Sequence, residues 1–376
     1  MLTVEKAVLL DSLTWLIRAV PVRPNIQALE GIKIEIKSDN TITLSAYNNE
    51  LYMENTIPAT TKSEETIIIP GKLFFEMIKS TPSSKIEIKK DEKLNKFVIL
   101  GDKTRFTINS ILPEEYPAVL EKGEKQGKVD SENLFAAISK TYNASNHDES
   151  VPVLASVKMS FIDNTIQYDS TDRFRLAKAV GSWKNENNLK SDILVGSRGI
   201  NELSKAFREK GELDIFLKKG NNDKYTTVAF STPDKLIILP LLNVEKFPPT
   251  DTLFNDKHET VVTVNAKHLL ESLSRAKIVS LKNRVMLDFD EMQVKITAGE
   301  DGDIGSTEES IQARIVGASK KVIYNIGYLQ DGIAPIESKN INIKMNEPQR
   351  PNEIVALDEN GKELSDYRYL IVPISS

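Results

Sequence analysis

The three histidines of the chain are the first residues to consider as catalytic or metal-binding groups. His147 lies in a polar stretch, His258 in a linker and His268 near the start of a predicted helix. No two of them have the spacing of metal ligands, and the chain has no cysteine that could supply a thiolate or a disulfide. We therefore expect no metal site, no bound cofactor and a structural role for each histidine.

Two loops resemble ligand-binding motifs only superficially. Gly101-Asp102-Lys103-Thr104 looks like the end of a phosphate-binding loop, but residue 96 is lysine where that motif requires glycine. The acidic stretch 299–305 lacks the residue pattern and the terminal glutamate of a calcium-binding loop. The Gly-x-Ser-x-Gly sequence of many hydrolases is also missing. These patterns indicate no active site.

Basic residues recur on the polar faces of five of the six predicted helices. They are Lys6, Arg18, Lys72, Lys79, Lys140, Arg198, Lys205, Arg208, Lys267 and Arg275. A solvated face explains any one helix, but the repetition favours a shared basic surface that contacts phosphates without reading bases. The net charge of −5 argues weakly against a nucleic-acid partner, although a net charge says nothing about how charge is distributed.

The elements that carry these residues form three copies of one pattern. An amphipathic helix begins near Glu5, and again near Ser131 and Asn265. A second helix begins near Pro70, Gly196 and Asn325. The spacing between these successive starts is the length of a domain, so the repeating unit is a domain. Asp130 or Ser131, and Asn265, are candidate helix caps.

Each pair of helices is separated by a predicted β-hairpin with alternating apolar residues. In the first copy, Ile32, Ile34 and Ile36 precede the turn Ser38-Asp39-Asn40. The linkers near 118–128 and 249–259 are polar. The sequence therefore predicts an α+β fold of three tandem domains, each with two helices on antiparallel sheets, over residues 1–122, 128–250 and 258–376.

The order of several short motifs resembles the bacterial sliding clamp family, the β subunit of DNA polymerase III. The matching motifs are Arg23-Pro24, Ile69-Pro70-Gly71-Lys72-Leu73-Phe74-Phe75, Arg105-Phe106-Thr107-Ile108, Leu112-Pro113, Tyr116-Pro117, Thr171-Asp172-Arg173-Phe174-Arg175-Leu176-Ala177, Phe247-Pro248 and Tyr369-Leu370-Ile371-Val372-Pro373. The resemblance covers the whole chain. This sequence departs from the family pattern at Arg173-Phe174, at Thr252, in the loop 281–284 and at its end, Ile374-Ser375-Ser376.

The resemblance implies a head-to-tail homodimer of three-domain DNA-clamp subunits that closes into a ring around duplex DNA. Helices would line the hole and sheets would form the outer wall, which reconciles the acidic net charge with DNA binding. The implied partners are duplex DNA, the polymerase III α subunit, the clamp loader, and other polymerases and repair proteins with clamp-binding motifs. No catalysis is implied, and the expected location is the bacterial cytoplasm, since no signal peptide or membrane segment is evident.

The resemblance also implies three groups of site residues. In the DNA-facing set the resemblance implies Arg23 and Arg198, and the basic residues of the predicted helices complete it: Lys72, Lys79, Lys140, Lys205, Lys267 and Arg275. The dimer-interface set comprises Phe106, Ile108, Ile278 and Val279. The partner-peptide pocket comprises Leu154, Thr171, Arg175, Leu176, Pro248, Leu253, Asn325, Tyr328, Leu370, Val372, Pro373 and Ile374, and it suits a short motif with Gln, Leu and Phe anchors.

Two alternatives stand beside this interpretation. One is a hydrolase or sugar-binding enzyme built from repeated β-rich domains, which would need paired carboxylates or an activated nucleophile. The other is a scaffold with no DNA in its hole.

Overall fold

The computed structural model describes residues 1–91, 96–146, 148, 150–208, 210–243, 247–254, 257–290, 292–299, 305–346 and 350–374. These residues form two compact units. Unit 1 contains residues 1–129, 205–207 and 211–241, and unit 2 contains residues 130–204, 208–210 and 242–376. His147, most of the acidic stretch 299–305 and the terminal Ser375-Ser376 lie outside the described residues.

Unit 1 contains two α-helices and two antiparallel sheets. Its elements are β1 (Leu2–Glu5), α1 (Lys6–Leu16), β2 (Gly31–Ile36), β3 (Thr41–Tyr47), β4 (Tyr52–Pro58), β5 (Thr60–Thr61), β6 (Glu65–Pro70), α2 (Gly71–Ser80), β7 (Lys85–Asp91), β8 (Lys96–Leu100), β9 (Arg105–Asn109), β10 (Glu124–Asp130, whose last residue belongs to unit 2), β16 (Glu212–Lys219), β17 (Tyr225–Ser231) and β18 (Lys235–Pro240).

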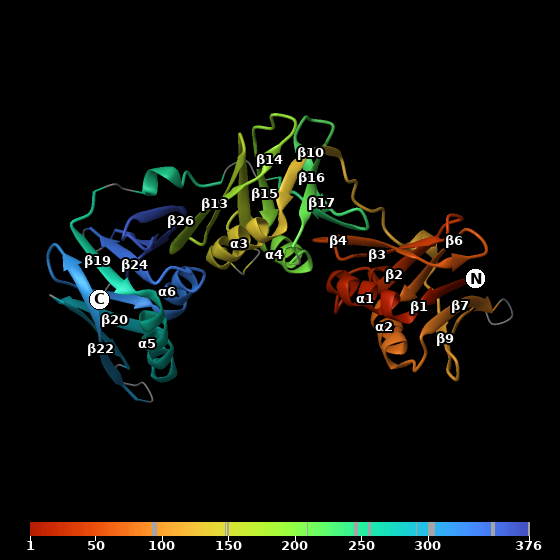
Figure 1. Ribbon diagram of the computed structural model, residues 1–376, viewed down its shortest axis with the longest axis horizontal. Helices are drawn as coiled ribbons and strands as arrows, with labels where there is room; N and C mark the ends of the chain where they lie inside the picture. The colour runs from red at the N-terminus through yellow and green to blue at the C-terminus, as the bar shows by residue number, and fades with distance from the viewer. Residues whose placement is uncertain are drawn as a thin grey trace. The chain divides into compact units, whose positions relative to one another are not determined.

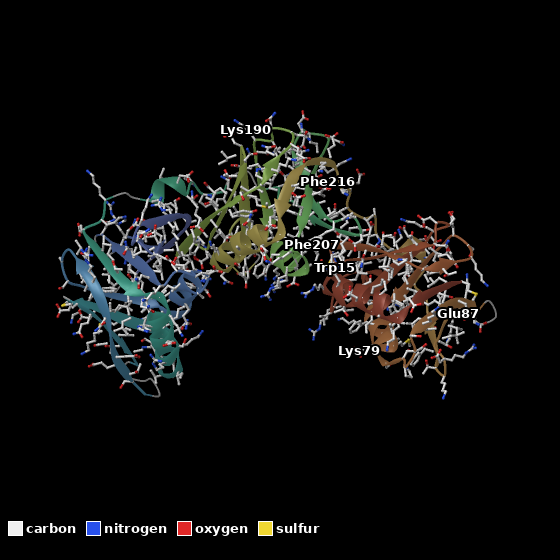
Figure 2. All side chains as sticks on the ribbon, viewed as in Figure 1. Trp15, Lys79, Glu87, Lys190, Phe207 and Phe216 are labelled. Atoms are coloured by element: carbon white, nitrogen blue, oxygen red, sulfur yellow. The ribbon has the colours of Figure 1, made fainter. Side chains whose placement is uncertain are left out.

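The two sheets of unit 1 follow the orders β5-β1-β7-β8-β9 and β10-β16-β17-β18-β4-β3-β2-β6. Helices α1 and α2 pack together and α1 contacts β3 and β4 (Figure 1). The indole N–H of Trp15 on α1 donates to the backbone oxygen of Ala206, and the Trp15 ring meets Phe207 edge-on at 5.9 Å (Figure 2). This contact buries one end of α1 against residues that come from the second repeat.

Unit 2 contains the other four α-helices and one long sheet. Its elements are α3 (Ser131–Thr141), β11 (Ser156–Ile162), β12 (Thr165–Thr171), β13 (Arg175–Ser182), β14 (Lys184–Asn185), β15 (Ser191–Gly196), α4 (Ser197–Ala206, whose last two residues belong to unit 1), β19 (Thr260–Asn265), α5 (Ala266–Val279), β20 (Arg284–Asp290), β21 (Gln293–Ala298), β22 (Thr307–Val316), β23 (Lys320–Asn325), α6 (Ile326–Ile333), β24 (Asn340–Met345), β25 (Asn352–Leu357) and β26 (Glu363–Ile371).

The sheet of unit 2 follows the order β15-β11-β12-β13-β26-β25-β24-β19-β22-β21-β20-β23. The pairing of β13 with β26 joins the sheet of the second repeat to that of the third, with Leu176 opposite Leu370. Helices α5 and α6 of the third repeat pack side by side (Figure 1), α5 against β21 and β22 and α6 against β23 and β26.

The helix starts agree with the sequence prediction. Asp130 accepts a hydrogen bond from the backbone N–H of Asn133, and Asn265 accepts one from His268; Ser131 is the first residue inside α3 rather than its cap. A side-chain oxygen at this position satisfies a backbone donor that the first helical turn leaves unpaired. In the described part of the chain, none of the helices is both long and apolar enough to cross a membrane.

Candidate functional site

The turn between β12 and β13 is fixed by its own side chains. Asp172 Oδ1 accepts hydrogen bonds from the backbone N–H groups of Phe174 and Arg175, at 2.9 and 3.0 Å. Thr171 Oγ1 donates to the backbone oxygen of Arg175 at 2.7 Å. Arg173 takes a left-handed conformation with φ of 80°, which a short turn requires. As a result Phe174 is 56% exposed while Arg175 is buried.

The guanidinium group of Arg175 connects the second repeat to the third. Its Nε lies 3.0 Å from Asp172 Oδ2, and its Nη1 donates to Asp331 on α6. Its Cζ lies 4.2 Å from the centre of the Tyr328 ring, also on α6. Three contacts of this kind position the groups around Arg175, because a planar guanidinium can bind carboxylates along its edge and an aromatic ring on its face.

The C-terminal segment closes this region from a third side. The backbone N–H of Val372 donates to the backbone oxygen of Phe174, and that of Ile374 donates to the backbone oxygen of Ile323 on β23, both at 2.8 Å. The Phe174 ring stacks on Tyr328 with centroids 6.5 Å apart and an interplanar angle of 24°. The turn, α6 and the C-terminal segment thus surround one region within unit 2.

Several predicted pocket residues come together in this region. Leu176 and Leu370 are buried and directly opposite each other, and Thr171 lies opposite Leu176 on the next strand. Asn325 caps α6 by accepting from the Tyr328 N–H. Leu154 is buried, Pro248 and Leu253 are exposed, and Val372, Pro373 and Ile374 are partly buried. Membership of one binding pocket stays a prediction for the set.

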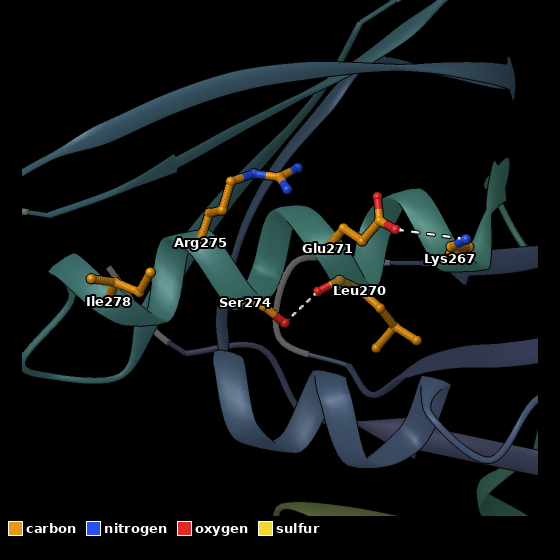
Figure 3. A pocket seen from close by; sticks show the side chains of 6 residues that line it. All are labelled: Lys267, Leu270, Glu271, Ser274, Arg275 and Ile278. Atoms are coloured by element: carbon orange, nitrogen blue, oxygen red, sulfur yellow. Dashed lines mark hydrogen bonds and ion pairs between the residues drawn. The ribbon is translucent and has the colours of Figure 1, made fainter.

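Basic residues of α5 lie beside a shallow hollow on the exposed face of that helix. The hollow has a volume of about 350 Å³ and is lined by Lys267, Leu270, Glu271, Ser274, Arg275 and Ile278 (Figure 3). Lys267 pairs with Glu271 at 4.0 Å. Arg275 binds Glu309 on β22 through two hydrogen bonds, of 3.0 and 2.7 Å. Each predicted cation on this helix therefore has an acidic partner.

The remaining predicted DNA-facing residues divide between the units. Unit 1 holds exposed Arg23, Lys72, Lys79 and Lys205. In unit 2, Arg198 is exposed at the start of α4, and Lys140 on α3 pairs with Asp366 at 2.8 Å. That these residues share one surface stays a prediction.

The predicted dimer residues differ in what they expose. Phe106 is partly buried on β9, the edge strand of its sheet, whereas Ile108 is only 3% exposed and packs inside unit 1. Ile278 is 72% exposed at the end of α5, and Val279 is partly buried. Ile278 therefore has the most apolar surface of this set to offer a partner, Phe106 and Val279 have some, and Ile108 has almost none.

Sequence reasoning missed a buried ionic cluster in the third repeat. Glu353 is 1% exposed and lies within ion-pair distance of Arg368, Lys344 and His258. Lys344 also binds Glu363, and although burial would raise the pKa of Glu363, hydrogen bonds from Asn342 and Lys344 hold that pKa below its ordinary value. No spacing in the sequence relates these residues, because the contacts join different strands.

Three repeats of paired helices on antiparallel sheets define the class of sliding clamps. Family models for the DNA polymerase III beta subunit match the chain throughout: the N-terminal domain over residues 1–120, the central domain over 128–249 and the C-terminal domain over 251–375. The chain belongs to the DNA polymerase III beta subunit family. The sliding-clamp interpretation therefore holds over the enzyme and scaffold alternatives.

Similar proteins span the whole length of the chain. The beta sliding clamp of Streptomyces coelicolor is 26% identical, covering 99% of this chain and 98% of its own length. The beta sliding clamp homolog GriR of Streptomyces muensis is 25% identical with the same coverage. The crystal structure of the Bacillus subtilis DNA polymerase sliding clamp superposes with a TM-score of 0.91 at 23% identity, covering 100% of this chain and 99% of the other.

Proposed function

We propose that the protein is a processivity clamp: a non-catalytic ring that encircles duplex DNA and tethers the replicative polymerase to it. The observation that carries this proposal is the match of all three family domains, in order, over nearly the entire chain. The relatives are named sliding clamps. The domains would be 1–122, 128–250 and 258–376, and the location would be the bacterial cytoplasm.

DNA binding would be non-specific. The candidate cations on α2, α3, α4 and α5 would contact phosphates, which carry no sequence information. On α5 the acidic partners of Lys267 and Arg275 would compete with phosphate for the same cations. Weak, exchangeable contacts suit a ring that must slide.

Partner proteins would bind at the region around Arg175. It combines a buried leucine pair, the aromatic rings of Phe174 and Tyr328, and backbone groups of the C-terminal segment. An apolar groove with a few fixed polar groups suits a short peptide with Gln, Leu and Phe anchors. The polymerase III α subunit, the clamp loader, and other polymerases and repair proteins would compete for it.

The ring would close as a homodimer through Phe106 and Ile278, with Ile108 and Val279 as the other predicted members of the interface. A large exposed isoleucine at the end of a helix is the kind of surface that a second subunit covers. The proposal is tested by retention on circular DNA and release on linearisation, because only a topological attachment depends on the ends of the DNA.

A further inference from the structure

Two cations face each other where the sheets of the second and third repeats join. Lys178 on β13 lies directly opposite Arg368 on β26, two residues along from the pair Leu176 and Leu370. Residues at this spacing point to the same face of a sheet. Like charges directly opposite each other in antiparallel strands destabilise the pairing, so this junction requires compensation.

The compensation comes partly from an aromatic ring in the segment that leads to the third repeat. Phe254 places its ring 5.3 Å from Lys178 Nζ and 4.4 Å from Arg368 Cζ. Both distances are within the range of a cation–π interaction. One ring therefore interacts with both cations of the junction.

Carboxylates complete the neutralisation on either side. Lys178 binds Asp251 and lies 3.5 Å from the buried Asp169. Arg368 Nε binds Glu353. Asp251 is the first residue of the short helical turn η5 (Asp251–Leu253), and Phe254 directly follows its last residue. This turn is therefore attached to the sheet at both ends.

Leu253 lies between these two attachments. It is 52% exposed and belongs to the proposed peptide groove, but it has no polar group in its side chain that could hold it in place. Its position therefore depends on its neighbours. Asp251 is held by its ion pair with Lys178, and Phe254 is held by its contacts with Lys178 and Arg368.

We propose that Phe254 is a positioning residue of the peptide groove, which holds Leu253 against the groove by covering the facing cations Lys178 and Arg368. This role requires no contact between Phe254 and the partner peptide. The inference rests on the proposed partner-binding function.

The test is a double-mutant cycle on peptide affinity in the full-length protein. A fluorescently labelled synthetic peptide with Gln, Leu and Phe anchors is titrated with wild type, Phe254→Ala, Leu253→Ala and the double variant. Phe254→Leu keeps apolar bulk and removes the aromatic ring. Phe75→Ala is the matched control, since the centre of the Phe75 ring lies 5.7 Å from Lys79 Nζ in unit 1, and the predicted groove residues all belong to unit 2. Circular dichroism verifies the fold of each variant.

We expect Phe254→Ala and Phe254→Leu to weaken peptide binding about fivefold, because losing the two cation–π contacts frees η5 and leaves Leu253 less well ordered for binding. Phe75→Ala should bind like wild type, and Phe254→Ala should add nothing in the Leu253→Ala background. An unchanged affinity, or the same loss in both backgrounds, overturns the inference. If Phe254→Ala does not fold, Phe254→Leu decides. A wild-type protein that does not bind the peptide rejects the proposed groove itself, and the inference with it, from the first titration alone.

Discussion

Arg175 on β13 donates a hydrogen bond to Asp331 on α6, so one ion pair joins the second repeat to the third. The Arg175 side chain is 4% exposed and that of Asp331 is 39% exposed. Arg175 also binds Asp172 within its own turn. The arginine that the sequence predicts in a binding pocket is thus already held by two carboxylates, and we expect it to organise the proposed groove.

Replacing Arg175 should destabilise unit 2 strongly. Arg175→Met leaves the buried Asp172 carboxylate without its cation, which costs about 3 kcal/mol. Asp331→Asn should cost about 1 kcal/mol, because Asp331 is partly solvated. Urea unfolding measures the change in the free energy of unfolding for both variants. Asp163→Asn, which removes the exposed pair with Lys190, should change stability by less than about 0.5 kcal/mol. Equal stability of Arg175→Met and wild type would refute this role.

A charge on the edge strand β9 should open the dimer. Phe106→Asp places a carboxylate in the proposed apolar contact, where burying a charge costs free energy. We expect monomers by light scattering at concentrations where wild type is dimeric. Thr107→Asp adds the same charge to the exposed, opposite face of β9 and should leave the dimer intact. A dimeric Phe106→Asp protein would remove the interface assignment.

Truncating the groove should weaken partner binding without opening the dimer. Leu176→Ala combined with Val372→Ala removes apolar surface on which a leucine or phenylalanine anchor would pack, and we expect peptide affinity to fall at least about tenfold. Leu44→Ala controls for lost stability, because Leu44 is equally buried but lies on β3 in unit 1. Undiminished affinity in a titration would place the pocket elsewhere.

The pair Arg275–Glu309 should make stability depend on pH. The hydrogen bond from Arg275 lowers the pKa of Glu309 below its ordinary value of 4.5. A carboxyl group whose pKa is lower in the folded state stabilises the protein above the unfolded pKa, and this contribution is lost as pH falls through the folded pKa. Glu309→Gln should therefore cost less than about 1 kcal/mol at pH 7 and nothing once the pH is well below 4.5.

The matched control for this pair is Glu308→Gln. Glu308 is the neighbouring residue, on the opposite face of β22, and it pairs with Lys295. The Glu308→Gln substitution removes the same charge and leaves the contact between Arg275 and Glu309 unchanged. If both variants show the same pH profile, the effect of Glu309→Gln comes from net charge, and the specific role of the Arg275 contact is wrong.

Local patterns were sufficient to predict the helices and hairpins. Apolar periodicity located the six α-helices of the described residues, and the caps Asp130 and Asn265 follow from side-chain chemistry next to the helix start. The joining of β13 to β26 could not be predicted in this way, because strand pairing between repeats depends on contacts across more than a hundred residues.

The members of the candidate site stay a prediction from sequence, whereas their contacts with one another could not be predicted at all. The family motif identified Arg175 and Leu176, yet only the fold shows that Asp331 binds Arg175. Phe254 and Glu353 carried no local signal: one is a single aromatic residue in a polar linker, and the other is a glutamate in an apolar strand. Both acquire partners only when distant strands meet.

The most direct measurement of the central claim is retention on DNA of defined topology. The protein is loaded onto nicked circular DNA with a clamp loader and ATP, half of the sample is linearised, and bound protein is compared after gel filtration. A closed sliding ring predicts retention on the circle and loss from the linear form. Equal retention on both forms would mean ordinary phosphate or groove binding and would contradict the clamp mechanism.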